Sequence, residues 1–177
     1  MLYFLYRVGG INLNSIFKRR SYRKFLDKEV SMAKIEMLLK AGMQAPSACD
    51  GRPWEFYVIT NKDKLLELAS ATPYSMCVKN CSVAIVPCYV YNKLKSPDYI
   101  ICDMSACVEN ILIEAEEIGL GAVWIGGAPV RERIDSIRNI LSLDKDIVPF
   151  CIIPVGYPVS RKDIEDRYDS SLVHFIK

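Results

Sequence analysis

The sequence is poor in histidine: His174, near the C-terminal end, is the only one. A serine or cysteine nucleophile with a histidine base would therefore have to use that residue. Zinc-type spacing is scarce too, because Cys77 and Cys81 lie four residues apart and no second pair follows them. These two cysteines are expected to be packed thiols. A phosphate-binding P-loop motif is also missing, so the sequence argues against a triad hydrolase, a zinc protein and a P-loop enzyme.

The sequence has no excess charge of one sign and no long apolar run. Lys and Arg number 23 against 21 Asp and Glu, a net charge of +2, which argues against a nucleic-acid partner. No segment reaches the roughly 20 apolar residues that a membrane span needs. The start, MLYFLYRVGG, is interrupted by Arg7 and lacks the basic region and cleavage site of a signal peptide. We interpret residues 1–11 as an N-terminal arm that packs on the body or on a partner.

The seven cysteines are an odd number, and several lie within apolar segments. A secreted disulfide framework would have an even number in a loop-rich chain. Reduced thiols and a cytoplasmic location are therefore expected. With 177 residues, of which 51% are hydrophobic, the chain is long enough to bury a core without disulfides. Residues 12–177 are expected to form a single domain.

Apolar spacing and turn residues predict one α+β domain. Helices are expected at 12–19, 31–45, 62–70, 97–119 and 130–142. Strands are expected at 54–60, 83–90, 120–125 and 148–156, followed by a polar, loop-like tail.

Three details of these elements can be predicted. The helix at 31–45 should bury one face, made of Ile35, Leu38, Leu39 and Gly42. Pro87 should mark a bulge or a sheet edge, because proline cannot donate to a strand ladder. The helix at 97–119 should turn five residues inward: Cys102, Ala106, Val108, Ile111 and Ala115.

Residues 18–24 (KRRSYRK) form the strongest local feature, with five basic residues around a serine. Arginine guanidinium groups match phosphate geometry, and a serine hydroxyl adds a donor. A solvated helix end would also explain the charges. A nucleic-acid patch fits less well, because such patches extend over a face and shift the net charge. One small phosphate ester is the better match among ligands.

Two further segments combine rigidity with polar groups. Residues 45–54 (APSACDGRPW) form a loop with two prolines, in which Ser47, Asp50 and the backbone amides near Ala48 offer contacts. An ordinary connection between a helix and a strand would look the same. Residues 119–127 (GLGAVWIGG) lack dinucleotide-binding spacing, but Gly126 and Gly127 at the strand end let backbone approach a flat ligand.

The remaining candidates favour structural roles. Glu114, Glu116 and Glu117 are expected on a solvated helix face. Tyr74 and Trp124 are candidate pocket walls, but aromatic core is the expected place for each.

The order of these segments resembles the nitroreductase family of flavin mononucleotide (FMN) enzymes from about Asn12 to Phe175. Its landmarks are RRSYRKF at 19–25, APS at 45–47, RPWEF at 52–56, DMSA at 103–106, GLGAVWIG at 119–126, VGYP at 155–158 and DRYD at 166–169. Each motif is weak alone, and the ordered set is fairly specific. The resemblance implies an α+β nitroreductase-like fold, with a mixed central sheet flanked by helices, in an intertwined homodimer with FMN at the interface.

The resemblance also implies a set of cofactor-binding residues. Residues Arg19, Ser21, Arg23 and Arg167 match positions that hold the flavin phosphate, and Arg20 matches a neighbour that contacts the cofactor through its backbone. A loop that reaches the flavin from the other subunit corresponds to Pro46, Ser47, Ala48 and Asp50. The backbone run along the flavin ring corresponds to Ile125, Gly126 and Gly127.

Two positions depart from the family pattern: Asp50 replaces the usual Asn and Arg52 the usual Gln. An aspartate accepts hydrogen bonds but cannot donate them, so Asp50 is expected either to accept from the ring or to pair with Arg52.

The resemblance implies an enzyme in which NADH or NADPH reduces FMN and an electron-poor small molecule is then reduced in the same pocket, a ping-pong cycle. Flavin supplies the chemistry, so no catalytic side chain is assigned and water can supply protons. The acceptor would be a nitroaromatic, a quinone or a similar compound. The alternatives are a non-catalytic FMN-binding, storage or sensor protein, a relative with dehalogenase or flavin-breakdown chemistry, and a small nucleic-acid-binding module.

Overall fold

The structure, a computed structural model, describes residues 7–8, 11–12 and 14–177. Within the predicted arm, β1 (Arg7–Val8) pairs antiparallel with β2 (Ile11–Asn12). The prediction that the arm packs on the body or on a partner falls mostly on residues 1–6 and 9–10, outside the described part. Helix α1 (Asn14–Lys18) begins two residues later than predicted.

The centre of the molecule is one sheet. Its long strands are β3 (Trp54–Ile59), β4 (Val83–Val90) and β8 (Cys151–Gly156), and the order continues to the short β5 (Gly121–Ala122). Two further short strands, β7 (Ile147–Pro149) and β6 (Ile125–Gly126), pair with β4 and β8 respectively. These ladders are antiparallel, whereas the bridge between Ser21 and Ala122 is parallel.

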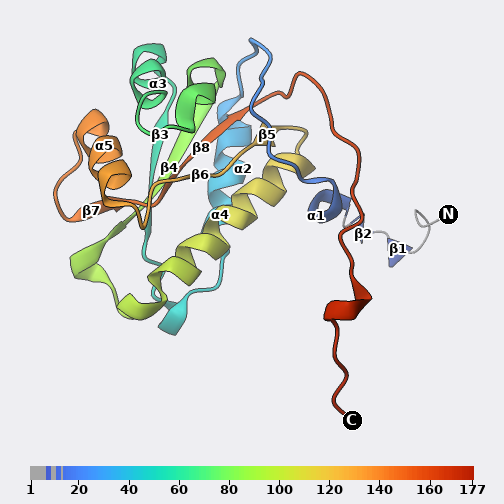
Figure 1. The fold of residues 1–177 in the computed structure, drawn as a ribbon. Coiled ribbons are helices and arrows are strands. Elements are labelled where there is room, and N and C mark those ends of the chain that lie inside the picture. Colours follow the sequence, from blue (N-terminus) through green and yellow to red (C-terminus); the bar gives the residue numbers. More distant parts are fainter. Residues whose placement is uncertain (1–6, 9–10, 13) are drawn as a thin grey trace.

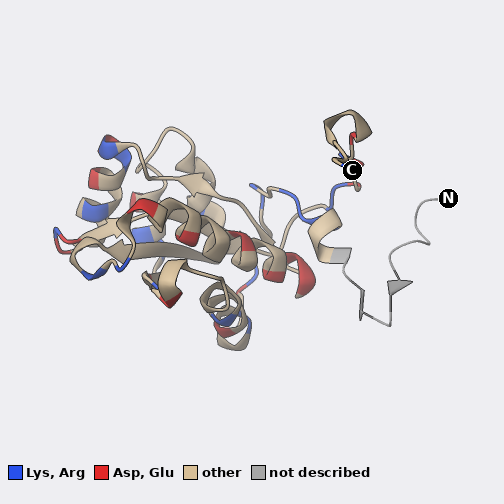
Figure 2. Cartoon of the chain, turned by 90° about the horizontal axis from the view of Figure 1, so that it is seen from below, with Lys and Arg blue, Asp and Glu red and all other residues tan. Residues whose placement is uncertain are grey.

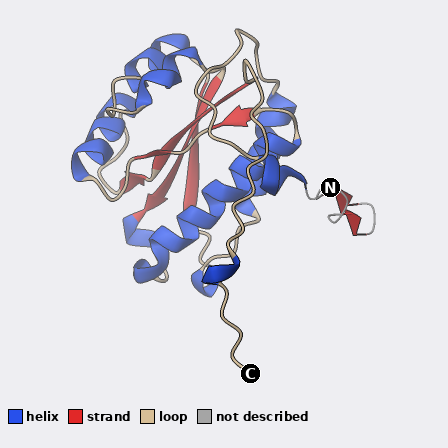
Figure 3. Ribbon diagram, turned by 45° about the vertical axis from the view of Figure 1, so that its right-hand side comes forward, coloured by secondary structure: helices blue, strands red, loops and turns tan. Residues whose placement is uncertain are grey.

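Helices cover both faces of the sheet (Figures 1 and 3). One face carries α2 (Met32–Met43) and α4 (Ile100–Glu117), and the other carries α3 (Lys62–Leu68), the 3-10 helix η2 (Ser75–Asn80) and α5 (Arg131–Leu141). Successive strand residues point to opposite faces, so Val83 and Ile85 join one core and Ala84 and Val86 the other. This arrangement explains why β4 is buried along its whole length.

Pro87 marks a bulge rather than an edge, since β4 has neighbours on both sides. Cys88 pairs with Pro149, and Ile85 pairs with Ile153. Three residues of the partner chain, 150–152, therefore lie opposite two residues of β4, 86–87, and the register of the ladder shifts by one residue. The missing N–H of Pro87 lies within this interruption, where the N–H of Phe150 donates to the Pro87 carbonyl at 2.8 Å. The expected single strand at 148–156 is therefore split into β7 and β8.

The α2–α4 pair confirms the predicted face of α2. Ile35, Leu38 and Gly42 are buried and Leu39 packs against the same core. A Cβ at Gly42 would lie 2.9 Å from Ile111 Cγ1, so the two helices approach too closely for a larger residue there. Pro46 follows the end of α2, as predicted.

The inward face of α4 differs from the prediction. Val108, Ile111 and Ala115 are buried as expected, but Cys102 is exposed and Ala106 is only partly buried. Their places are taken by Met104 and Cys107. The reason is the helical period: at about 100° per residue, positions 102 and 106 lie on the side of α4 opposite Val108, whereas positions 104 and 107 lie on its buried side.

Other differences concern the short elements. The strand expected at 120–125 is two two-residue strands, β5 and β6, and the 3-10 helix η2 lies in a segment given no element by the sequence. The tail is loop-like, as predicted, apart from the short 3-10 helix η5 (Ser170–Leu172). All seven cysteines are free thiols. In the part of the chain that the structure describes, none of the helices is long and apolar enough to span a bilayer.

Candidate functional site

The basic segment after α1 is held in place by backbone contacts. The N–H of Tyr22 donates to the Ala122 carbonyl at 3.0 Å, and Ser21 forms a parallel bridge to the same residue. Farther along, Phe25 pairs with Pro158. Tyr22 is 4% exposed and packs so closely on Gly121 that a Cβ there would lie 2.9 Å from the ring. The backbone of residues 21–25 is therefore held between the edge strand β5 and the chain that follows β8.

The cations of this segment lie beside the acidic C-terminal half of α4 (Figure 2). Arg19 Nε is 2.9 Å from Glu109 Oε1, whereas Arg23 is exposed. From the tail, Lys162 Nζ donates to the Ser21 carbonyl at 3.4 Å. The segment therefore gathers positive charge around Ser21, with one of its arginines already bound to a carboxylate.

Arg20 has an unsatisfied donor. Its Nη1 donates to the carbonyls of Phe17 at 3.0 Å and Arg19 at 2.9 Å. Its Nη2 is buried and has no hydrogen-bond partner among the residues that the structure describes. A buried donor of a charged group without an acceptor is costly, so this atom points to an anionic or carbonyl ligand. The residues present therefore fit a phosphate-bearing group.

Arg167, in the tail, forms an ion pair with Glu165. Its Nη2 lies 2.9 Å from Glu165 Oε2. Hydrogen bonding from Arg167 lowers the pKa of Glu165, and the positive charge of Arg20 contributes in the same direction. The structure thus pairs Arg167 with Glu165, whose carboxyl also experiences the charge of Arg20.

The loop after α2 is tied to the N-terminal half of α4. Asp103 is 7% exposed, and its Oδ1 accepts the N–H of Ala48 at 2.9 Å. The amide of Ala48 is therefore committed to Asp103, although the sequence had suggested it as a ligand donor. Ser47 Oγ accepts the N–H of Arg52 at 3.0 Å, and Pro46 is exposed.

Of the two roles considered for Asp50, the structure shows the ion pair. Arg52 Nε and Nη2 donate to Asp50 Oδ1 and Oδ2 at 2.7 and 2.9 Å. This bidentate contact lowers the pKa of the Asp50 carboxyl, mainly through the hydrogen bond. Cys49, Asp50 and Arg52 all have positive φ, at 53°, 49° and 46°, so the loop has a strained, specific conformation.

Removing the Asp103 carboxylate is expected to loosen this loop. An Asp103→Ala variant should lose about 1–3 kcal/mol of unfolding free energy, because the Ala48 N–H and the buried space lose their partner. Asp103→Asn, which keeps an acceptor oxygen, should lose less. Urea unfolding together with limited proteolysis of the loop measures both; equal stability of the alanine variant and wild type would contradict the anchoring role.

The glycine run combines one packed and one open position. Ile125 is buried and pairs with Ile152, and a Cβ at Gly127 would lie 3.1 Å from the Phe150 carbonyl oxygen. At Gly126, by contrast, a Cβ would meet no atom of the described residues within 4 Å. Backbone is therefore open to a ligand at Gly126.

The two candidate aromatic residues, Trp124 and Tyr74, lie in different environments. Trp124 packs against the core, with its ring centroid 5.5 Å from that of Phe150, as expected. Tyr74 is 65% exposed, so the expectation that it belongs to the core is wrong. The guanidinium of Arg133 lies 5.2 Å from the Tyr74 ring and donates to the Gly126 carbonyl at 3.4 Å. Tyr74 thus stands close to the open glycine.

The position of Glu116 also differs from the prediction of a solvated helix face. Its side chain is only 8% exposed and its Oε1 lies 2.6 Å from Arg161 Nη1, so it does not belong to a solvated face. Burial raises its pKa, against the opposing effect of Arg161. Its position one helical turn after the buried Leu112 was the available signal, but its partner lies 45 residues away in a tail without periodicity.

The predicted site residues form two groups within one chain. Glu109, which binds Arg19, and Asp103, which binds Ala48, are six residues apart on α4, or about 9 Å along the helix axis. The basic segment, the tail and the glycine run lie toward β5 and β6, and the loop lies at the other end of α4 (Figure 1).

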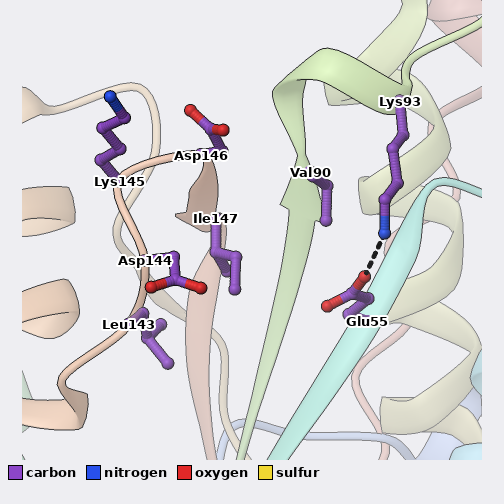
Figure 4. A pocket seen from close by; sticks show the side chains of 8 residues that line it. All are labelled: Glu55, Val90, Lys93, Leu143, Asp144, Lys145, Asp146 and Ile147. Carbon is purple, nitrogen blue, oxygen red and sulfur yellow. Dashed lines mark ion pairs between the residues drawn. The ribbon is translucent and has the colours of Figure 1, made fainter.

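A hollow of about 680 Å³ lies elsewhere, at the ends of β3, β4 and β7 (Figure 4). It mixes lysines with carboxylates, including a Lys93–Glu55 ion pair at 3.5 Å. It contains none of the predicted site residues.

Comparison with known proteins agrees with this fold. The chain matches the Nitroreductase family over residues 16–76 and 71–157. A relative from Methanothermobacter thermautotrophicus, provisionally named NADH dehydrogenase/NAD(P)H nitroreductase, is 39% identical over 93% of this chain and 86% of its own length. A solved structure from Clostridium acetobutylicum, provisionally titled NADH oxidase, has a TM-score of 0.89 at 40% identity, covering 92% and 99% of the two chains. An FMN-dependent nitroreductase from Clostridium difficile R20291 has a TM-score of 0.85 at 32% identity, covering 92% and 98%.

The fold is thus the α+β fold of flavin-type reductases, and the chain belongs to the nitroreductase family. The resemblance seen in the ordered motifs and the predicted α+β nitroreductase-like fold are confirmed, whereas the homodimer stays a prediction.

Proposed function

We propose that this protein is an FMN-dependent oxidoreductase that uses NADH or NADPH to reduce an electron-poor small molecule, such as a nitroaromatic or a quinone. The observation that carries the proposal is the buried Nη2 of Arg20, which lies within a cluster of cations and has no partner among the described residues. Family membership and the FMN-dependent relative from Clostridium difficile support it.

In this proposal, the phosphate of FMN is held by Arg19, Ser21, Arg23 and Arg167, with Arg20 beside them. A phosphate that is close to doubly ionised needs about this much positive charge to neutralise it. Guanidinium groups bind such a phosphate in a bidentate manner. Arg19 keeps donors for this role, because only one of its five N–H groups is needed for Glu109.

The flat ring is assigned to the backbone of Ile125, Gly126 and Gly127. The open space at Gly126 supports this assignment, and exposed Tyr74 supplies an aromatic wall next to it. When bound, FMN supplies hydride transfer between the nicotinamide and the acceptor. The chain's own residues bind and orient the cofactor, and donor and acceptor use the same pocket in turn.

We propose a homodimer, in which Pro46, Ser47, Ala48 and Asp50 reach the flavin of the other subunit. The separation of this loop from the basic segment along α4 supports that arrangement. The tail beyond residue 168 extends away from the body with Leu172, Phe175 and Ile176 exposed (Figure 1), as expected of a segment that packs on a second copy. The free thiols agree with the proposed cytoplasmic location. Sedimentation of the flavin-loaded protein should give twice the chain mass; a monomer that holds FMN would contradict the homodimer.

The anaerobic visible spectrum tests the activity. The purified protein, after incubation with FMN, should show a flavin band that NADH or NADPH bleaches and an electron-poor acceptor such as a quinone restores. A flavin band that persists with both nicotinamides would indicate a binding, storage or sensor protein instead. Absence of flavin binding would overturn the proposal.

A Gly126→Ala variant tests the ring assignment. The added methyl meets no protein atom, so stability should change by less than about 0.5 kcal/mol. The methyl would occupy the space assigned to the ring, so FMN and riboflavin should both bind more weakly. Thermal melting and flavin fluorescence titration provide the two readouts. Unchanged affinity for both flavins would show that the ring lies elsewhere.

A further inference from the structure

The chain that follows β8 runs alongside the basic segment in the opposite direction. The N–H of Leu26 donates to the Tyr157 carbonyl at 2.8 Å, Phe25 bridges Pro158, and the N–H of Val159 donates to the Lys24 carbonyl at 3.1 Å. The backbone pairing ends there. Side chains continue the contact, since Lys162 Nζ reaches the Ser21 carbonyl.

Arg161 and Glu116 join this segment to α4. Their contact is 2.6 Å long and joins a nearly buried Glu116 to an Arg161 that is 42% exposed. The guanidinium of Arg161 also lies 5.5 Å from the ring centroid of Tyr22, the buried residue between Ser21 and Arg23. One side chain of the tail thus touches both α4 and the basic segment.

Glu116 also faces two further cations. The charges of Lys18 and Arg20 act on its carboxyl in addition to that of Arg161. Beyond Arg161, the tail carries Lys162 on Ser21 and then Glu165 near Arg20, with Arg167 bound to Glu165. The tail side chains that act on Ser21 and Arg20 are therefore downstream of the Glu116 contact.

We propose that the Glu116–Arg161 ion pair is a latch that positions the tail, and with it Lys162 and Arg167, against the phosphate-binding segment. Glu116 is a positioning residue in this role, because it touches the tail and not the phosphate. The inference rests on the proposed function, since it names the part of the chain that completes the phosphate end of the same site.

The latch predicts an effect opposite in sign to simple electrostatics. A carboxylate near a bound phosphate repels it, so neutralising Glu116 would strengthen FMN binding if charge were its only influence. If the latch holds the tail, neutralising Glu116 releases Arg161 and weakens binding. The sign of the change therefore separates the two roles.

The experiment compares Glu116→Gln, Arg161→Ala and the double variant, with Glu117→Gln as the matched control. Glu117 is the exposed neighbour on the same helix end, and its substitution changes the net charge equally. Arg161 is partly exposed, so Arg161→Ala breaks the ion pair without substituting the nearly buried Glu116. Each full-length protein, freed of flavin, is titrated with FMN and with riboflavin, which lacks the phosphate, and its thermal unfolding is recorded.

We expect Glu116→Gln and Arg161→Ala each to weaken FMN binding about tenfold, the scale of one charge-assisted contact. Riboflavin affinity should be unchanged, and the double variant should be no weaker than either single one. Glu117→Gln should bind FMN as the wild type does.

Other results would overturn the latch. Tighter FMN binding by Glu116→Gln, equal losses for FMN and riboflavin, or additive losses in the double variant would each do so while leaving the proposed function intact. A wild-type protein that binds no FMN would overturn the proposed function and the latch together.

Discussion

Arg19→Ala and Arg23→Ala are each expected to bind FMN about 1.5–3 kcal/mol more weakly than the wild type, the scale of hydrogen bonds to charged groups. This range corresponds to roughly a 10- to 150-fold rise in Kd. Arg19→Ala should lie at the upper end, because it leaves the Glu109 carboxylate, now 2.9 Å from Arg19, without its partner beside the phosphate. Titration of flavin fluorescence gives both constants.

Two comparisons make this prediction specific. Riboflavin should bind all variants alike, since it carries no phosphate. Arg131→Ala removes an exposed arginine from α5, where it pairs with Asp135, and should leave FMN affinity unchanged. If both cluster variants bind FMN as tightly as the wild type, the basic segment is not the phosphate site.

Gly121→Val is expected to lower the free energy of unfolding by about 1–3 kcal/mol or more, the usual cost of overpacking. Its Cβ would lie 2.9 Å from Cγ and Cδ2 of the Tyr22 ring. The ring cannot easily move away, because Tyr22 is buried and its N–H is bound to the Ala122 carbonyl. A shift of Tyr22 would displace Ser21 and Arg23 on either side of it, so FMN affinity should fall as well.

Urea unfolding and flavin titration measure the two effects. Gly126→Ala serves as the comparison, because a side chain at that glycine meets no protein atom. A Gly121→Val protein as stable as the wild type would mean that the close approach of Tyr22 to β5 does not hold the basic segment in place.

Local patterns in the sequence predicted most of the elements. The apolar period of 31–45 placed Ile35, Leu38 and Gly42 on the buried face of α2, and the continuous apolar run at 83–90 is the fully buried strand β4. Pro87 correctly indicated a bulge. These features depend on steric and hydrogen-bonding preferences of neighbouring residues, so they can be predicted from local sequence.

The errors arose where distant parts of the chain meet. Tyr74 was expected in the core, but the fold places it on the surface beside Arg133. The error at Cys102 has a different origin, because the helical period itself places this residue on the side of α4 opposite Val108, where it is exposed. The residue type alone does not determine whether such a side chain is covered by another part of the chain.

The sequence by itself determined the class of protein, because the ordered motifs from the basic segment to the late arginine indicate the nitroreductase family. Only the tertiary structure decided which polar groups are paired. It bound Asp103 to Ala48, Glu109 to Arg19 and Glu116 to Arg161. It left Nη2 of Arg20 buried with no acceptor in the part of the chain that the structure describes. Such pairings join residues between 45 and 90 positions apart, so they exist only once the sheet and α4 have brought the segments together.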